Sequence, residues 1–114
     1  MLTVDALREY GANVEEGLER CMGNEAFYFR MIKMAAADTG VEKLKSALAE
    51  GNLETAFEAA HALKGVMTNL ALTPVADPVI DITEHLRAKE EMDYQPALEL
   101  INRKFEELKT LCEE

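Results

Sequence analysis

The 114-residue sequence has no apolar run approaching the ~20 residues that a membrane-spanning helix requires. Its N-terminus has no basic region followed by an apolar run and a small-residue cleavage site, so we expect neither a signal peptide nor a transmembrane span. Basic residues are also few, since 12 Lys and Arg stand against 22 Asp and Glu, for a formal net charge of −10. That balance disfavours binding to nucleic acid or to anionic membrane surfaces, which both recruit clustered Lys and Arg. We therefore expect a cytoplasmic protein.

Sequence signatures of cofactor and metal sites are also missing. The two cysteines, Cys21 and Cys112, form no CxxC motif, and their number does not require a disulfide scaffold. No GxxxxGK[ST] motif and no other glycine-rich nucleotide loop occurs. His61 and His85 fall in different segments, with no cysteine or paired ligand at metal spacing. We expect no bound cofactor and no metal site.

The residues that are present predict helices throughout. No alternating strand pattern occurs, and single Gly, Asn or Thr residues separate the helix-forming segments. The predicted helices cover residues 3–10, 14–21, 27–37, 39–50 and 53–70, and a last helix follows Asp93. Thr73-Pro74 and Asp77-Pro78 are alternative starts for the helix between, and we expect a kink or a short extra turn near Pro78.

Several of these helices have recognisable ends and faces. Asn13 with Glu16, and Thr39 with Glu42, have the spacing of capping boxes, and Asn52 suits an N-cap position. The segment 27–37 is apolar nearly all round, which predicts a deeply packed helix. The simplest interpretation of three methionines is that they fill the core: Met31, Met34 and Met67.

The last helix has apolar residues at alternating three- and four-residue steps, which is the pattern of a bundle seam. These residues are Leu98, Ile101, Phe105, Leu108 and Cys112. With 48% apolar residues, a chain of this length can form one compact domain. We therefore predict an all-α fold, an antiparallel four-helix bundle with short additional N-terminal helical segments, in one domain spanning residues 1–114. A seam-closed bundle of this size can be a monomer.

The most informative segment is Ala60-His61-Ala62-Leu63-Lys64-Gly65-Val66 in the predicted helix 53–70. At about 100° per residue, the apolar residues of this helix gather in one stripe. They are Leu53, Ala56, Ala60, Leu63, Met67 and Leu70. His61 lies roughly 120° from the middle of that stripe, so its side chain should face outward. On the same flank we expect Glu54, Phe57, Glu58, Lys64, Gly65 and Thr68.

The residues around His61 favour phosphoryl chemistry. An imidazole is largely neutral and nucleophilic near pH 7. Lys64, three positions on, can hold a phosphoryl oxygen as a mobile charge. Gly65 costs roughly 1 kcal/mol against Ala in a helix interior, and its missing side chain leaves the imidazole open to a partner. A lone surface histidine usually has no function, and we assign none to His85, which lacks such neighbours.

These residues resemble the histidine-containing phosphotransfer (HPt) domain of bacterial multistep phosphorelays. The signature is His61-Ala62-Leu63-Lys64-Gly65-Val66, followed by Asn69-Leu70 and Leu72, and the similarity covers roughly residues 11–112. The resemblance implies a four-helix bundle with His61 as phosphoacceptor, at Nε2, and Lys64 steadying the phosphoryl group. It also implies that the partners are response-regulator receiver domains, a hybrid histidine kinase, or both, with Mg²⁺ bound in the receiver. The protein itself would be a phosphocarrier with no ATP site and no autokinase activity.

Two positions depart from the family's usual pattern. The family commonly has a small polar residue where Met67 stands and Gly where Ala71 stands. By the helical wheel Met67 lies on the core side, so we expect it to affect packing. Ala71 would affect the space offered to a receiver domain.

Two other interpretations of the chain compete with the phosphorelay carrier. A degenerate HPt-like adaptor would bind receiver domains without phosphotransfer. The other is the phosphoacceptor region of a sensor histidine kinase. In such regions the histidine is typically followed at once by an acidic residue, whereas Ala62 follows His61 here. Such a region would also have two long helices, and we disfavour it.

Overall fold

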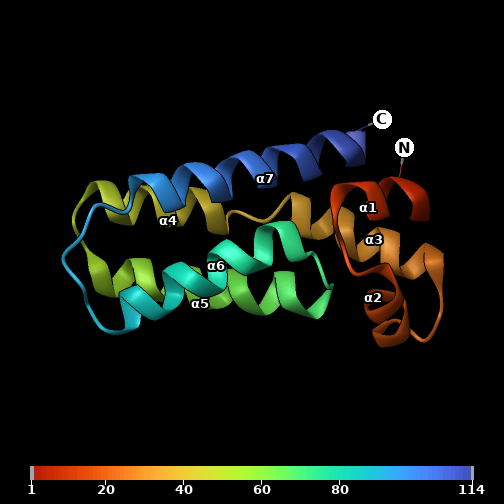
Figure 1. The fold of residues 1–114 in the computed structure, drawn as a ribbon, viewed down its shortest axis with the longest axis horizontal. Coiled ribbons are helices and arrows are strands. Elements are labelled where there is room, and N and C mark those ends of the chain that lie inside the picture. Colours follow the sequence, from red (N-terminus) through yellow and green to blue (C-terminus); the bar gives the residue numbers. More distant parts are fainter. Residues whose placement is uncertain (1, 114) are drawn as a thin grey trace.

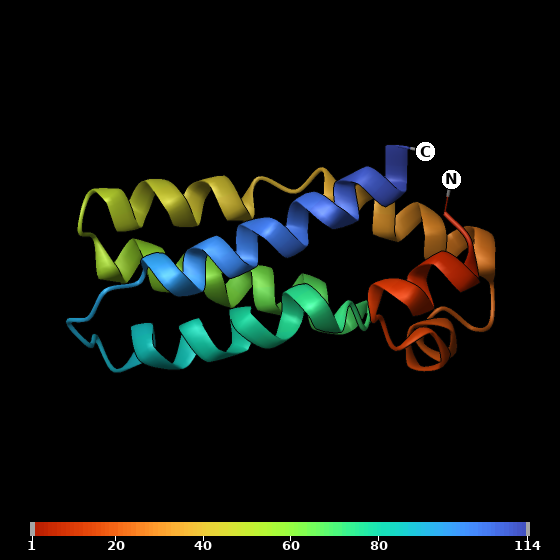
Figure 2. The same cartoon turned by 45° about the horizontal axis from the view of Figure 1, so that its top comes forward.

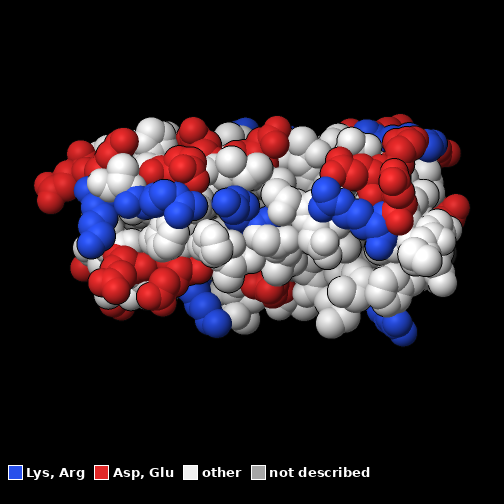
Figure 3. Space-filling model, turned by 90° about the horizontal axis from the view of Figure 1, so that it is seen from below, with Lys and Arg blue, Asp and Glu red and all other residues white. Residues whose placement is uncertain are grey.

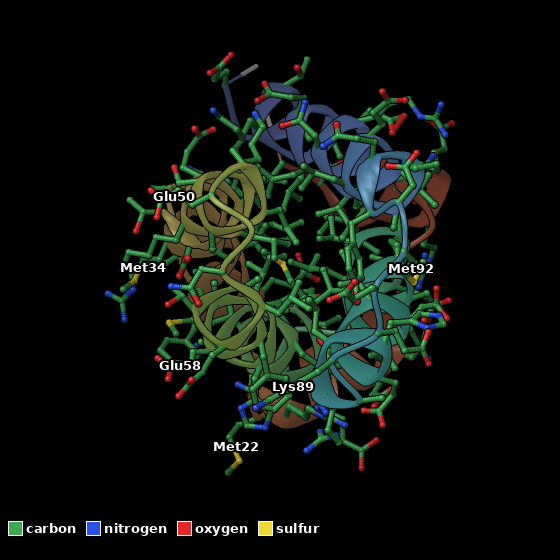
Figure 4. The ribbon with its side chains drawn as sticks, turned by 90° about the vertical axis from the view of Figure 1, so that its left-hand side faces the viewer. Met22, Met34, Glu50, Glu58, Lys89 and Met92 are labelled. Carbon is green, nitrogen blue, oxygen red and sulfur yellow. The ribbon has the colours of Figure 1, made fainter. Side chains whose placement is uncertain are left out.

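The core of the molecule is a closed ring of four antiparallel helices, seen in a computed structural model that describes residues 2–113. The helices are α4 (Gly40–Ala49), α5 (Leu53–Asn69), α6 (Thr73–Arg87) and α7 (Gln95–Glu113). Each packs against the next, and α7 packs against α4 (Figures 1 and 2). Figure 4 shows the four helices around a common interior. The predicted all-α four-helix bundle is confirmed.

Apolar residues at helical spacing fill this interior. Among the largest fully buried side chains are Leu44, Leu63, Met67, Ile82, Leu86, Ile101 and Leu108. On α5 the stripe includes Ala56 and Ala60, whose small side chains let neighbouring helices approach closely. The core position expected for Met67 is therefore confirmed. Between residues 2 and 113 no helix combines the length and the hydropathy needed to cross a bilayer.

Three short helices cover one end of the bundle. They are α1 (Val4–Tyr10), α2 (Val14–Arg20) and α3 (Glu25–Ala36). Figure 1 shows that α3 continues the line of α4, while α1 and α2 lie beyond the ends of α5 and α6. The Tyr10 hydroxyl on α1 donates to the Lys104 carbonyl of α7 at 2.7 Å. The predicted N-terminal helical segments are confirmed.

The N-terminal helices also satisfy the carboxyl end of α5. The last carbonyls of a helix have no partner within it and must find donors elsewhere. The Arg20 guanidinium donates to the Thr68 carbonyl at 2.9 Å, and its charge suits the negative end of the helix dipole. The buried Tyr28 hydroxyl donates to the Leu70 carbonyl at 2.8 Å. Burial raises the pKa of Tyr28 to about 12, with smaller contributions from Cys21 and nearby carboxylates.

The Tyr28 hydrogen bond should be measurable as stability. Tyr28→Phe leaves the Leu70 carbonyl without its side-chain donor in a buried place, which should lower the free energy of unfolding by about 1–3 kcal/mol. Tyr10→Phe removes a similar bond at a half-buried site, where water can replace the hydroxyl, and should cost less. Urea denaturation of the three proteins checks the order. Equal losses in the two variants would contradict it.

Ala71 adopts the left-handed backbone conformation that ends α5. Its φ is 55° and it is 6% exposed. Its carbonyl accepts a hydrogen bond from the Asn13 N–H at 3.0 Å. Glycine adopts positive φ without steric cost, and other residues rarely do. Alanine in place of the family's usual glycine at position 71 therefore makes this backbone conformation less favourable. The effect of Ala71 on the space offered to a receiver domain stays a prediction.

The expectation that residues 27–37 form a deeply packed helix is wrong. Met34 is 61% exposed and Phe27 is 37% exposed. Met31, also expected in the core, is half-buried. The reason is position, because α3 extends past the bundle and packs on α7 and α2 without a full ring of neighbours. Figure 4 shows Met34 pointing away from the bundle. An apolar surface results.

Most of the predicted helix starts agree with the structure, and one N-cap does not. Asn13 and Asn52 are N-caps, and their side-chain oxygens accept from Glu16 N–H and Thr55 N–H at 3.3 and 3.0 Å. The predicted capping box at Thr39 is wrong, because the Thr39 side chain makes no cap hydrogen bond. The Asp38 carboxylate instead accepts a hydrogen bond from the Gly40 N–H at the start of α4. Of the two alternative starts, α6 takes the first, at Thr73-Pro74, and Pro78 lies inside it. Both cysteines are free, Cys21 buried and Cys112 half-buried.

Candidate functional site

His61 lies in the middle of α5 and faces solvent. The residue is exposed, while Ala60 beside it is completely buried. This contrast between consecutive positions confirms the outward direction that the helical wheel predicts. An exposed imidazole on a continuous helix has a fixed backbone and an accessible ring. Its chemistry therefore depends on the side chains around it.

On one side His61 has an aromatic neighbour. The Phe57 ring, one turn earlier on α5, lies 5.6 Å from the His61 ring between centroids, with the planes inclined at 32°. The Arg87 guanidinium, at the end of α6, lies 5.1 Å from the centroid of the Phe57 ring. The helical wheel placed Phe57 on this flank. It gave no sign of Arg87, because the approach of another helix cannot be obtained from one helix's periodicity.

On the other side the helix surface is open. A Cβ added at Gly65 would meet no atom within 4 Å. Lys64 is half-buried, and the Thr68 hydroxyl donates to its carbonyl at 2.7 Å. Among residues 2–113, Lys64 forms no ion pair within 4.0 Å. The Lys64 ammonium is thus available to an incoming anion.

A shallow groove between α3 and α5 begins beside Gly65. Its lining is mainly apolar and comprises Met31, Met34, Ala35, Asp38, Ala62, Gly65, Val66, Asn69 and Leu70. Met22, which is 92% exposed, points outward like Met34 (Figure 4). An apolar groove with an exposed methionine such as Met34 is typical of a protein-binding site.

Charge is unevenly distributed on this face of the molecule. Figure 3 shows the face on which α5, α6 and α2 lie, with separate groups of basic side chains along its middle. Acidic side chains flank these groups, and a broad uncharged area lies toward the α2 end. The chain of net charge −10 therefore carries basic side chains gathered on this face.

The second histidine, His85, has different surroundings. It lies on α6, and its Nδ1 is 2.8 Å from a Glu90 oxygen, while Nε2 is 3.8 Å from an Asp81 oxygen. The hydrogen bond to Glu90 raises the pKa of His85 above 6.5, opposed by partial desolvation and aided by both negative charges. His61 and His85 do not come together in one site.

The Glu90 contact predicts a pH dependence. Because the folded-state pKa of His85 is raised, the contact stabilises the fold below about pH 6.5, and this contribution is lost as pH rises through the raised pKa. In Glu90→Gln the pKa of His85 should fall toward its ordinary value. NMR titration of the His85 ring protons measures both proteins. The same pKa in the two would contradict the assignment to Glu90.

The described residues contain no group of three or more His, Cys, Asp or Glu side chains placed to share a metal ion, counted over residues 2–113. The candidate site has an exposed His61 imidazole, the half-buried Lys64 and open space beside Gly65. A neutral imidazole nitrogen is a nucleophile, and an ammonium attracts phosphate oxygens.

The comparisons with known proteins identify the family of the chain. The family model described as Hpt domain matches residues 32–114, which is most of the chain. The protein therefore belongs to the Hpt domain family. Comparison with curated proteins and with solved structures gives no significant match. Membership implies phosphotransfer in two-component signalling, by a phosphocarrier that interacts with receiver domains or histidine kinases. Helices α1 and α2 precede the matched residues.

Proposed function

We propose that the protein is a phosphorelay intermediate with His61 as its phosphoacceptor. The observation that carries this proposal is the exposed His61 with the open surface at Gly65 and the unpaired Lys64 on the same face. A ring nitrogen of His61, Nε2 by resemblance to the family, attacks the phosphorus of a receiver's aspartyl phosphate. The N–P bond forms as the P–O bond breaks, and the electron pair leaves on the aspartate carboxylate. Transfer onward to a second receiver is the reverse step.

Each of the other groups has a role in this proposal. Lys64 interacts with the transferring phosphoryl oxygens, whose charge changes in the reaction. Gly65 lets the receiver's aspartate approach the imidazole. The apolar groove between α3 and α5 supports docking of a receiver domain beside the site. Mg²⁺ would be bound by the receiver, and the carrier needs neither an ATP site nor autokinase activity.

We further propose that residues 1–114 act together as a single unit in the cytoplasm and that the carrier is a monomer. Three contacts support the first point, since α1, α2 and α3 bond to α7 and to the end of α5. Apolar side chains of the chain's own helices fill the interior of the bundle, which supports the monomer.

Incubation with phosphorylated receiver domains and Mg²⁺ tests the proposal. The chain should acquire a phosphoryl group that is lost in acid and stable in base, as for a phosphohistidine. Incubation with ATP alone should give none. If a panel of receivers bound the chain but none transferred phosphate, the degenerate adaptor would be the better account.

Lys64→Gln should slow transfer about tenfold, equivalent to about 1.4 kcal/mol of transition-state stabilisation. The reason is loss of the positive charge, so Lys64→Arg should retain most of the rate. Lys43→Gln changes the net charge equally at an exposed position on α4 and is the control. Rapid-quench measurement of the transfer rate compares the four proteins. An equal effect of the Lys64 and Lys43 variants would indicate overall charge instead.

A further inference from the structure

Two pairs of an arginine and a phenylalanine ring lie on the surface, and only the pair at Phe57 contacts His61. Arg87 lies over Phe57 at 5.1 Å, and Arg30 lies over Phe27 at 5.4 Å. Both distances are within the roughly 6 Å over which a cation is attracted to a ring face. The Phe57 ring alone also contacts an imidazole, that of His61. The comparison between the two pairs separates packing from an effect on the site.

The contact constrains the His61 side chain. The centroid distance of 5.6 Å lies in the range of favourable aromatic pairs. An exposed side chain without partners samples several rotamers, and one that packs against a ring samples fewer. Because Phe57 precedes His61 by one turn and Gly65 follows by one turn, the imidazole has a wall on one side and open space on the other. The wall and the opening together define one direction of approach.

Arg87 in turn constrains Phe57. Its guanidinium comes from the last residue of α6 and also contacts the Glu84 carboxylate at 3.4 Å. Phe57 is half-buried in a shallow groove that Leu86 and Lys89 also line. The Phe57 ring is therefore held between its own helix and α6. The Phe57 ring therefore has the Arg87 guanidinium 5.1 Å and the His61 ring 5.6 Å from its centroid.

We infer that Phe57 is a positioning residue, held by Arg87, that orders the His61 imidazole for attack from the Gly65 side. The inference rests on the proposed role of His61 as phosphoacceptor. Phe57 contributes by restricting the ring to the rotamer that presents its nucleophilic nitrogen to the partner, and Arg87 acts through Phe57. Preorganisation of this kind affects the rate of the chemical step more than the affinity for the partner.

The test uses two measurements on Phe57→Leu, Phe57→Tyr and Arg87→Gln. Three-bond couplings to the His61 side chain give its rotamer populations in the unphosphorylated protein. Single-turnover transfer from a phosphorylated receiver gives the maximal rate and the apparent affinity separately. We expect Phe57→Leu to average the rotamers and to lower the maximal rate about tenfold with unchanged affinity. Phe57→Tyr should retain both properties, and Arg87→Gln should show a smaller loss than Phe57→Leu.

Phe27→Leu and Arg30→Gln are matched controls. Both variants should have the same His61 rotamer populations and the same maximal transfer rate as the wild type. An ordered His61 in Phe57→Leu would overturn the inference, as would averaged rotamers with an undiminished rate. Arg87 is exposed at the helix end, so Arg87→Gln keeps the test valid if Phe57→Leu fails to fold. A wild type that accepts no phosphate would remove the proposed function, while the rotamer data would still decide whether Phe57 orders the ring.

Discussion

His61→Gln is expected to abolish phosphoryl transfer from receiver domains completely, because glutamine has no nucleophilic ring nitrogen. The fold should be unaffected, since the side chain is exposed and glutamine is a good helix former. Transfer assays with a phosphorylated receiver measure the loss, and thermal denaturation measures the stability. The two results together separate chemistry from folding.

His85→Gln is the control for this substitution. It removes the other histidine, whose ring contacts Asp81 on α6 and Glu90 just after α6. Transfer to His85→Gln should proceed at the rate of the wild type. Equal labelling of His61→Gln and wild type would place the phosphate elsewhere and contradict the proposed acceptor.

Gly65→Gln is expected to change stability and transfer in opposite directions. A side chain here meets open space, and replacing glycine in a helix interior should raise the free energy of unfolding by about 0.5–1 kcal/mol. The same side chain stands one turn from His61, where it obstructs the receiver's aspartate. Transfer should fall about 100-fold, the order of loss when reacting groups are displaced by about an ångström. Denaturation and rapid-quench kinetics measure the two effects.

Two further variants show whether the loss arises from obstruction. Gly65→Ala should gain similar stability with a smaller loss of rate, because its side chain is short. Ala49→Gln places the same glutamine at an exposed position on α4 and should leave transfer unchanged. A stable Gly65→Gln protein with full transfer rate would refute the view that Gly65 provides access.

The helices of the bundle and the direction of His61 could be predicted because each follows from the apolar periodicity within one helix. The stripe through Ala60, Leu63 and Met67 fixes which side of α5 is buried, and His61 then has to face away. The caps at Asn13 and Asn52 are equally local. At Thr39 the local pattern was ambiguous, since Asp38, one residue earlier, supplies the helix with a competing acceptor.

What the sequence could not reveal depends on contacts between distant residues. Periodicity could not reveal that α3 extends beyond the bundle and leaves Met34 exposed. Nor could it pair Arg20 with the end of α5, or bring Arg87 over Phe57 from another helix. The signal at Ala71 is the resemblance itself, because a glycine in the family pattern points to positive φ. These contacts form only when the helices pack.

The central claim is that the phosphoryl group is bonded to a ring nitrogen of His61. Phosphorus–nitrogen correlated NMR of histidine-labelled protein, recorded after transfer from a receiver domain, tests this bond directly. The account predicts a single phosphoramidate, coupled to Nε2 of His61, with the His85 ring unmodified. A phosphate ester, an acyl phosphate or a phosphoramidate on His85 would contradict it.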